Sequence, residues 1–475
     1  MKKKLLSGLV SILFILFSVS LVSAVDRYVA TTGVDTPSCL VQASPCKTIT
    51  YAISQSNPIG DTINVAAGTY TEQVIINKAL TLKGPNFGID PNTGTRVSEA
   101  IIQTDDLTNH QAVLISSSDV TVDGFTLYGP NGAIKDIGAI GLSNTGPRTN
   151  VHIQYNKIFR TSGGTDWNCD GIRLDPPSND DASIYVEHNM INVGDNIQSA
   201  GNNDMTLADH GYWTTHSGTW VVGSPDRVVI KDNYFYGHSK IYVEGIGVLI
   251  DDNKFLGIWG PIEVRGSKDV IISNNEMIAQ TDVGIYAWSP KAGNSGAGLC
   301  SDITIIKNLI KGMKLDPQSF TDEGTGIILG GVTNALVSCN KIINGAGSGV
   351  VIGGEGYDHF DHSWGLAVGS YQPVNNIINN NNIYGNAAFG VRVDITVTSG
   401  IPINAENNWW GSLTGPTNPS NPGGTGDSVS NNVDFSPWGL KKDPCEPRAV
   451  PSSSPILIVL LLGSLALIGA KRIKV

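Results

Sequence analysis

The sequence predicts an all-β protein whose body is a right-handed, single-stranded parallel β-helix, with a short cap helix at its N-terminal end and a hydrophobic helix at its C-terminus. Three observations predict this fold. A short pattern of apolar residues and one asparagine recurs along the body. The intervals between successive repeats vary but do not fall below about 20 residues. A second apolar pair, preceded by glycine, follows many of the repeats.

The repeat reads apolar, any, apolar, any, any, asparagine, any, apolar. Its alternating apolar residues direct one face of a short strand into a core. Asparagine suits the turn that follows, because it tolerates left-handed backbone dihedrals and hydrogen-bonds its own backbone. When such turns stack, their amides can form a hydrogen-bonded ladder. The aligned asparagines are Asn156, Asn189, Asn233, Asn253, Asn275, Asn308, Asn340, Asn381 and Asn408.

The intervals favour a solenoid over a propeller. A propeller blade repeats every 40–45 residues or so and carries four strands, whereas the interval from Asn233 to Asn253 leaves room for two or three short strands. The other intervals exceed this length by different amounts, which is typical of loops inserted at the turns of a coil. The apolar pairs Ile262–Val264 and Ile285–Ala287 each follow a glycine, which indicates a next strand after a tight turn. In an earlier repeat, Phe125 takes the asparagine position.

The N-terminal stretch predicts a cap for the open end of the solenoid. Residues 47–56 have helical apolar spacing, residues 61–65 begin the strands, and residues 68–70 are expected to turn them. A helix here would cover apolar core and unpaired strand edges. Near the other end, Trp410 takes an inward position of the repeat, which favours core packing, and residues 416–427 are expected to form a loop.

The two chain ends predict export and attachment to a surface. Residues 1–24 combine three lysines, an apolar run and a Val-Ser-Ala cleavage site, and we expect a signal peptide. The body spans 25–440, and 441–454 form a linker. Residues 455–475 contain an apolar run followed by Lys471, Arg472 and Lys474, and are expected to be a membrane anchor or a cleavable sorting signal. The membrane is thus a partner through the tail, and the body faces outside.

The net charge and the cysteine content of the chain limit which partners and covalent links are expected. The formal net charge is −11 and no basic stripe crosses the body, which argues against nucleic acid. We expect a monomer. Six cysteines in an exported chain are candidates for disulfides. Cys39 and Cys46, seven residues apart in a polar segment, are expected to pair. The sequence does not decide the pairing of Cys169, Cys300, Cys339 and Cys445, and no cysteine or histidine spacing is typical of zinc.

Residues 57–84 (NPIGDTINVAAGTYTEQVIINKALTLKG), the asparagine coils and residues 405–416 (AENNWWGSLTGP) resemble pectin-lyase-like, NosD-type right-handed β-helix repeats of bacterial and archaeal surface proteins. The tail resembles PEP-CTERM and IPTL sorting signals by layout, without their diagnostic residues. The resemblance covers about residues 26–440 and implies a three-faced coil with ligands bound along one side. It implies no single activity, because this fold hosts lyases, hydrolases, epimerases and adhesins.

Three insertions are the places where chemistry is expected. They fall in 166–181 and in the two longest intervals, 189–233 and 340–381. Aromatic rings stack on sugar faces, and carboxylates hold hydroxyls or move protons, so both residue types together favour a glycan site. Packing of these loops onto the solenoid is the structural alternative. The expected ligand-binding residues are Trp167, Asp170, Asp209, His210, Trp213, His359 and Trp364.

Two enzymatic patterns are partly present. Tyr357, Asp361 and His362 resemble the catalytic set of alginate epimerases, in which His abstracts the C5 proton, Tyr acts as acid and Asp binds the carboxylate. The spacing of these residues differs from that of the epimerase motif, so the match is weaker evidence for this activity. A polygalacturonase-like order also occurs, again with altered details, in Asn168–Asp170, Asp180–Asp181, Gly237–Ser239 and Arg265–Lys268. Chance is the better explanation of that second order in a chain rich in glycine and asparagine.

Two hypotheses therefore remain. The favoured one is an exported surface protein that binds polysaccharide or mediates surface interaction. The other is a polysaccharide lyase, epimerase or hydrolase acting on an acidic glycan, supported if Tyr357, Asp361 and His362 converge with Asp209 or His210. No cofactor is expected. Asp175, Asp180 and Asp181 could hold Ca2+, but no regular calcium loop contains them.

Overall fold

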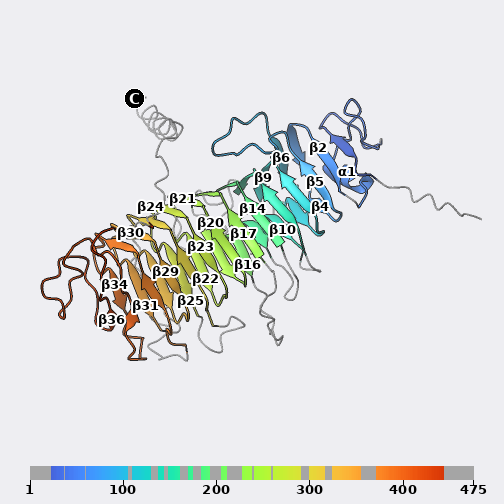
Figure 1. Ribbon diagram of the computed structural model, residues 1–475. Coiled ribbons are helices and arrows are strands. Elements are labelled where there is room, and N and C mark those ends of the chain that lie inside the picture. The colour runs from blue at the N-terminus through green and yellow to red at the C-terminus, as the bar shows by residue number, and fades with distance from the viewer. Residues whose placement is uncertain are drawn as a thin grey trace, which may run out of the picture.

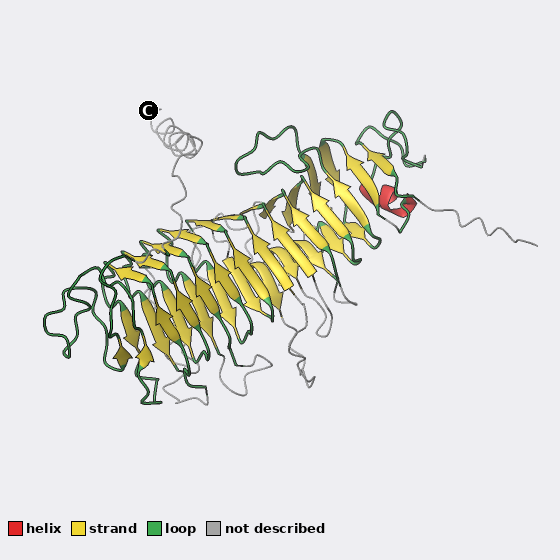
Figure 2. Ribbon diagram, in the orientation of Figure 1, coloured by secondary structure: helices red, strands yellow, loops and turns green. Residues whose placement is uncertain are grey.

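The computed structural model describes residues 23–36, 38–58, 60–104, 110–129, 137–143, 148–160, 169–174, 183–192, 205–210, 227–237, 240–257, 260–289, 299–315, 324–354, 371–442 and 445. These residues form one elongated stack of short strands in three sheets (Figures 1 and 2). The single helix in this part of the chain, α1 (Ile49–Gln55), lies at the N-terminal end of the stack.

The first sheet has fourteen strands in the order β1 (Asp26–Val29), β2 (Asp61–Val65), β5 (Leu80–Lys83), β8 (Val120–Asp123), β11 (Val151–Gln154), β14 (Ser183–Glu187), β17 (Arg227–Lys231), β20 (Val248–Asp251), β23 (Ile271–Ser273), β26 (Thr304–Ile306), β29 (Leu336–Ser338), β32 (Ile377–Asn379), β35 (Ile403–Asn404) and β36 (Val433–Asp434).

The second sheet has eleven strands in the order β3 (Gly68–Thr71), β6 (Ala100–Gln103), β9 (Thr126–Gly129), β12 (Lys157–Arg160), β15 (Met190–Asn192), β18 (Tyr234–Tyr236), β21 (Lys254–Leu256), β24 (Glu276–Ile278), β27 (Leu309–Lys311), β30 (Lys341–Ile343) and β33 (Asn382–Tyr384).

The third sheet also has eleven strands, in the order β4 (Val74–Ile76), β7 (Val113–Ile115), β10 (Ile137–Leu142), β13 (Cys169–Leu174), β16 (Met205–His210), β19 (Lys240–Glu244), β22 (Ile262–Arg265), β25 (Ile285–Trp288), β28 (Ile327–Gly330), β31 (Val350–Gly353) and β34 (Val391–Val393).

The order of these strands confirms the predicted parallel β-helix. From β2 to β35 the chain visits the first, second and third sheets in turn, so neighbours within one sheet come from successive coils and run parallel. Strand residues alternate between the interior and the outer face. In β14, for example, Ile184 and Val186 are fully buried, whereas Tyr185 between them is half-buried. The inward residues of all three sheets form one continuous apolar core.

A ladder of buried asparagines runs along the turn between the first and second sheets, as the repeat predicts. Asn275 shows the unit of the ladder. Its side-chain Nδ2 donates to the carbonyl of Ile250 in the preceding coil (3.0 Å) and to Oδ1 of Asn308 in the next coil (3.0 Å). Its own Oδ1 accepts from the backbone N–H of Asn253 (3.0 Å). The ladder runs from Asn156 to Asn408, and Asn156 Oδ1 accepts from the backbone N–H of Phe125, where the pattern begins.

The cap helix is held at both ends by the first coil. Thr48 caps its N-terminus through its hydroxyl, and the Glu72 carboxylate accepts from the backbone N–H groups of Ile49 and Thr50. Lys78 Nζ donates to carbonyls at the C-terminal end of the helix, including that of Ile53 (3.0 Å). Because both contacts satisfy helix-end groups that lack an intrahelical partner, they fix α1 against the open core.

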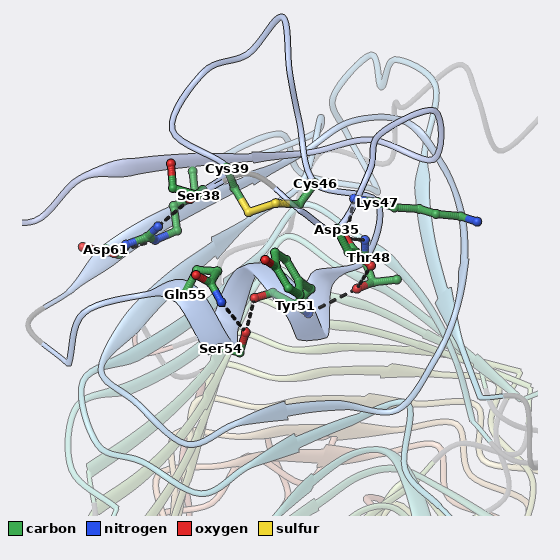
Figure 3. Close-up of a disulfide and its surroundings, with 11 residues drawn as sticks. Asp35, Ser38, Cys39, Cys46, Lys47, Thr48, Tyr51, Ser54, Gln55 and Asp61 are labelled. Atoms are coloured by element: carbon green, nitrogen blue, oxygen red, sulfur yellow. Dashed lines mark hydrogen bonds and ion pairs between the residues drawn. A yellow bond between two sulfur atoms is a disulfide. The ribbon is translucent and has the colours of Figure 1, made fainter.

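The loop before α1 is closed by a disulfide between Cys39 and Cys46, whose Cα atoms lie 5.2 Å apart (Figure 3). Both half-cystines are fully buried. The expectation for residues 68–70 was wrong, because they form β3 and not a turn. Tyr70 is 3% exposed and pairs in register with Ile102, so its side chain fills the core and keeps this segment extended.

Asp61 makes the cap sensitive to acid. Burial alone would raise the pKa of this carboxyl, but backbone N–H donors from Asn57 and Val25, together with the Arg27 guanidinium at 2.8 Å, lower the pKa below its ordinary value. Asp61 therefore stabilises the fold at pH values above its unfolded pKa of 3.8, and this contribution is lost as the pH falls through the lower folded value.

We expect Asp61→Asn to lower the free energy of unfolding by about 3 kcal/mol at neutral pH, because it leaves the buried Arg27 cation unpaired. Urea unfolding of both proteins between pH 6 and about pH 2 checks this. The difference between wild type and variant should shrink as the pH falls below 3.8. A difference that stays constant across that range would contradict the assigned role.

The C-terminal end of the stack is closed by Trp410, which is fully buried, as predicted. Residues 416–427 form no strand and only isolated bridges, in agreement with the expected loop. Cys300 and Cys339 are buried free thiols, and burial raises the pKa of Cys300 to about 12, so Cys300 is inert at neutral pH. Within the described ranges, no helix is long and apolar enough to span a membrane; residues 1–22 and 446–475 lie outside those ranges.

Candidate functional site

The third sheet is the face to which the sequence-predicted site belongs. From β11 onward, tight turns carrying the asparagine ladder join the first sheet to the second. Long connections also lead into or out of strands of the third sheet: residues 193–204 precede β16, residues 211–226 follow it, and residues 354–376 follow β31. Functional residues on a rigid scaffold commonly belong to such connections.

Most of the predicted site residues lie outside the described residues: Trp167, Trp213, Tyr357, His359, Asp361, His362 and Trp364, together with the proposed calcium ligands Asp175, Asp180 and Asp181. Their expected convergence stays a prediction. No group of three or more His, Cys, Asp or Glu residues that could hold a metal ion occurs in the part of the chain that the structure covers.

The expectation that Asp170, Asp209 and His210 lie in inserted loops was wrong. Asp170 belongs to β13, and Asp209 and His210 belong to β16. Asp209 pairs in register with Leu174 and Val243, both of which are core positions. The physical reason is that the interval 189–233 contains a complete third-sheet strand, so its excess residues divide into two connections.

The described members of the polygalacturonase-like order do not lie on neighbouring strands. Asp170 lies on β13, and Arg265 lies on β22, three strands further along the sheet. Neighbouring strands are separated by about 4.8 Å, which places these two backbones about 14 Å apart. His238, Asp180 and Asp181 lie outside the described ranges.

A polar and aromatic cluster instead occupies the outer face of the third sheet, on three successive strands. We call it the sheet-three cluster; its members are Lys240 and Tyr242 on β19, Glu263 and Arg265 on β22, and Tyr286 and Trp288 on β25. Tyr242, Glu263 and Tyr286 are register partners, and each lies between two inward residues of the core. This alternation fixes the cluster on the outside of the solenoid.

Glu263 joins the two sides of the cluster. Its Oε2 accepts from Lys240 Nζ at 2.9 Å, and its Oε1 accepts from the indole Nε1–H of Trp288 at 3.0 Å. Glu263 is 8% exposed and Lys240 is 5% exposed. A buried ion pair is retained only when hydrogen bonds satisfy both charges, and this geometry does so.

Arg265 forms the second pair of contacts. Its Nη1 donates to the Tyr242 hydroxyl at 3.2 Å, and its guanidinium lies over the Trp288 ring, 5.2 Å from the centroid. Tyr286 stacks on Trp288 with ring centroids 5.6 Å apart and planes 4° from parallel. Trp288 and Arg265 are the half-buried members, so they present an indole and a cation to solvent.

An apolar patch continues the cluster along the sheet. Val283, Tyr286, Ile328 and Val351 form a hydrophobic cluster separate from the core, with Trp288 packed against it. Ile328 pairs in register with the outward Tyr286, and Val351 pairs in register with Ile328; both are fully buried. The outward side chains therefore change from charged to apolar over neighbouring strands, and the apolar ones are covered, so Trp288 and Arg265 are the members of this region that a ligand can reach.

Sequence reasoning missed these residues because it used the apolar pairs only to locate strands. The signal was the residue between the members of each pair. In Ile241–Val243, Ile262–Val264 and Ile285–Ala287, that middle residue is tyrosine, glutamate and tyrosine. A strand residue between two core residues points outward, so this row could have been read as a polar and aromatic stripe.

The comparisons with known proteins concern the fold. A family model described as the right-handed β-helix region matches residues 196–357, and the chain is therefore a right-handed parallel β-helix. No curated protein matches the chain.

Three solved structures of proteins of different kinds show distant similarity to the chain. The GH136 lacto-N-biosidase from Eubacterium ramulus is 12% identical, with a TM-score of 0.36, over 88% of this chain and 68% of that chain. PfbA, a surface adhesin of Streptococcus pneumoniae, is 15% identical, with a TM-score of 0.34, over 70% and 84%. The A-module of the Azotobacter vinelandii mannuronan C-5 epimerase AlgE6 is 10% identical, with a TM-score of 0.31, over 81% and 90%. Such distant likeness describes the fold alone.

Proposed function

We propose that this right-handed β-helix protein is exported, held at the cell surface by its C-terminal tail, and binds polysaccharide on the outer face of its third sheet. One observation carries the binding part of the proposal. Trp288 is fixed between the Glu263 carboxylate and the Arg265 guanidinium, and it keeps part of its ring exposed. An aromatic ring flanked by charged hydrogen-bonding groups is what recognition of a sugar ring requires.

The cations of the cluster favour an acidic glycan. Arg265 presents a planar guanidinium, which matches carboxylate geometry. Lys240 supplies a second positive charge on the same face, although Glu263 offsets it. The chain as a whole carries a formal net charge of −11 and would repel an acidic ligand. Binding of such a ligand therefore requires positively charged side chains at the binding site itself.

A glycan-array screen paired with product analysis on uronate polymers tests the proposal. We expect binding to acidic glycans, with no new reducing ends, no unsaturated products and no changed epimer ratio. Failure to bind any glycan would contradict the binding function. Formation of any of those products would replace it by the enzymatic alternative.

The Tyr242–Arg265 contact favours that alternative as a second candidate, a lyase or epimerase on a uronate polymer. A phenol held by a guanidinium can exchange a proton while the cation neutralises a substrate carboxylate. A base, for which the sequence offers His362, would take the C5 proton. Tyr242 would then give its phenol proton either to C5 from the opposite face, which completes an epimerisation, or to the leaving oxygen as the C4–O4 bond breaks, which completes a lyase step. Tyr242→Phe would then abolish turnover while glycan binding persists.

The division of the chain belongs to the same proposal. Residues 1–24 would be removed on export, residues 25–440 would form the monomeric glycan-binding body, and residues 441–454 would link the body to the membrane-directed residues 455–475. Mass spectrometry of the protein isolated from its host checks both predicted processing sites. A mature chain that retains residues 1–24 would contradict the first of them.

A further inference from the structure

The last coil of the solenoid exposes several large apolar side chains to solvent. Ile395 is 84% exposed, Leu413 67%, Ile401 66% and Leu440 66%, and these are the four most exposed large hydrophobic residues in the described part of the chain. All four belong to the coil formed with β34, β35 and β36, the terminal strands of their sheets, at the red end in Figure 1 and opposite α1. Val34 and Val41 near the α1 end are also exposed, to 59% and 58%, so exposure alone does not distinguish the two ends; the side chains beside Leu440 and the residues that follow this coil do.

The neighbours of Leu440 have the character of a membrane interface. Trp438 precedes it, is half-buried, and donates its indole N–H to the carbonyl of Leu413 at 3.2 Å, which joins two of the apolar residues. Lys441 and Lys442 follow it, and both are exposed. Tryptophan and lysine beside apolar residues are enriched where protein meets the polar region of a bilayer. The acidic side chains of this coil are the exposed Asp434 and the half-buried Asp394, Glu406 and Asp427.

The sequence that follows this coil also indicates contact with a membrane. Residues 443–454 connect it to the apolar residues 455–470. Even fully extended, these twelve residues span no more than about 43 Å. A tail inserted in a bilayer would therefore hold this end, and not the distant α1 end, close to the lipid surface at a high effective concentration.

We propose that the last coil, through Ile395, Ile401, Leu413 and Leu440, rests on the surface of the bilayer that holds the tail. The solenoid would then stand on its C-terminal end, and the outer face of the third sheet would point sideways, open to glycan. The inference rests on the tether of the proposed function, and it adds a second contact between the body and the lipid.

Photo-crosslinking from lipid tests this contact. The chain with its tail is reconstituted into vesicles of phosphatidylcholine and phosphatidylglycerol that contain a lipid with a photoreactive group at headgroup depth. Crosslinked peptides are identified by mass spectrometry. We expect crosslinks in residues 393–402, 411–415 and 438–442 in addition to the tail. The double variant I395D/I401D should lower the yield at residues 393–402 about fivefold or more, with an unchanged melting temperature because both side chains are exposed.

The opposite end supplies a matched control. Val34 and Val41 are 59% and 58% exposed near the disulfide loop, so V34D/V41D changes a similar apolar surface far from the tail. Its crosslinking yield at residues 393–402 should equal that of the wild type. Crosslinks confined to the tail, equal crosslinking at both ends, or no loss in I395D/I401D would each overturn the inference while the tether stands. Failure of the chain to float with the vesicles would overturn the tether as well, without bearing on glycan binding.

Discussion

Replacement of Asn275 by alanine is expected to lower the free energy of unfolding by about 3–6 kcal/mol. The variant loses the side-chain bonds to the Ile250 carbonyl and to Asn308, and it strands the backbone N–H of Asn253, which donates to Asn275 Oδ1. Asn275 is 1% exposed, so water cannot replace these partners without opening the turn. Urea unfolding followed by circular dichroism measures the loss.

The neighbouring residue provides the control. Asn274 has the left-handed φ of +55° and is exposed, and its side chain donates only to Asp251. Asn274→Gly keeps the backbone conformation without strain and should change the unfolding free energy by less than about 0.5 kcal/mol. Equal effects of the two variants would show that the ladder is not a principal source of stability.

Trp288→Ala is expected to weaken binding of the best acidic glycan at least about tenfold, because it removes the stacking ring and the partner of Arg265 together. Arg265→Gln should weaken acidic glycans by a similar factor and neutral glycans much less, because only the former lose a charge-assisted contact. Isothermal titration calorimetry of both variants against one acidic and one neutral oligosaccharide measures these effects.

The control for these variants is an aromatic residue of the first sheet. Tyr185 is half-buried on the outer face of β14 and stacks on His152 with ring centroids 4.6 Å apart. Tyr185 belongs to the first sheet and is not part of the sheet-three cluster. Tyr185→Ala should bind glycan like the wild type. A loss equal to that of Trp288→Ala would indicate a general folding defect or another binding face.

The fold could be predicted from the sequence because it depends on a short pattern that each coil repeats. Each coil repeats the same inward apolar pair and the same buried asparagine, so Asn233 and Asn253 could be aligned without knowledge of any long-range contact. The cap helix was also predictable, since Ile49, Ala52 and Ile53 mark its buried face. Residues 68–70 were misjudged because the Gly-Thr-Tyr sequence favours a turn locally, whereas burial of Tyr70 and pairing with β6 keep it extended.

The site could not be predicted in the same way. Asp209 and His210 were assigned to a loop because the interval between repeats does not show where a third-sheet strand begins. Lys240, Glu263 and Trp288 are separated by more than twenty residues from one to the next, and only the stacking of coils brings their side chains into contact. The pattern fixes which side of a strand faces outward, but the partner of each outward residue depends on the lengths of the intervening loops.

Hydroxyl-radical footprinting of Trp288 with and without the best acidic glycan tests the central claim most directly. Trp288 and Trp438 are both half-buried and lie on different parts of the solenoid, so Trp438 serves as the internal reference. If glycan binds to the sheet-three cluster, the oxidation rate of Trp288 falls on saturation while that of Trp438 is unchanged. An unchanged rate at Trp288 under saturating glycan would contradict the assignment of the binding face.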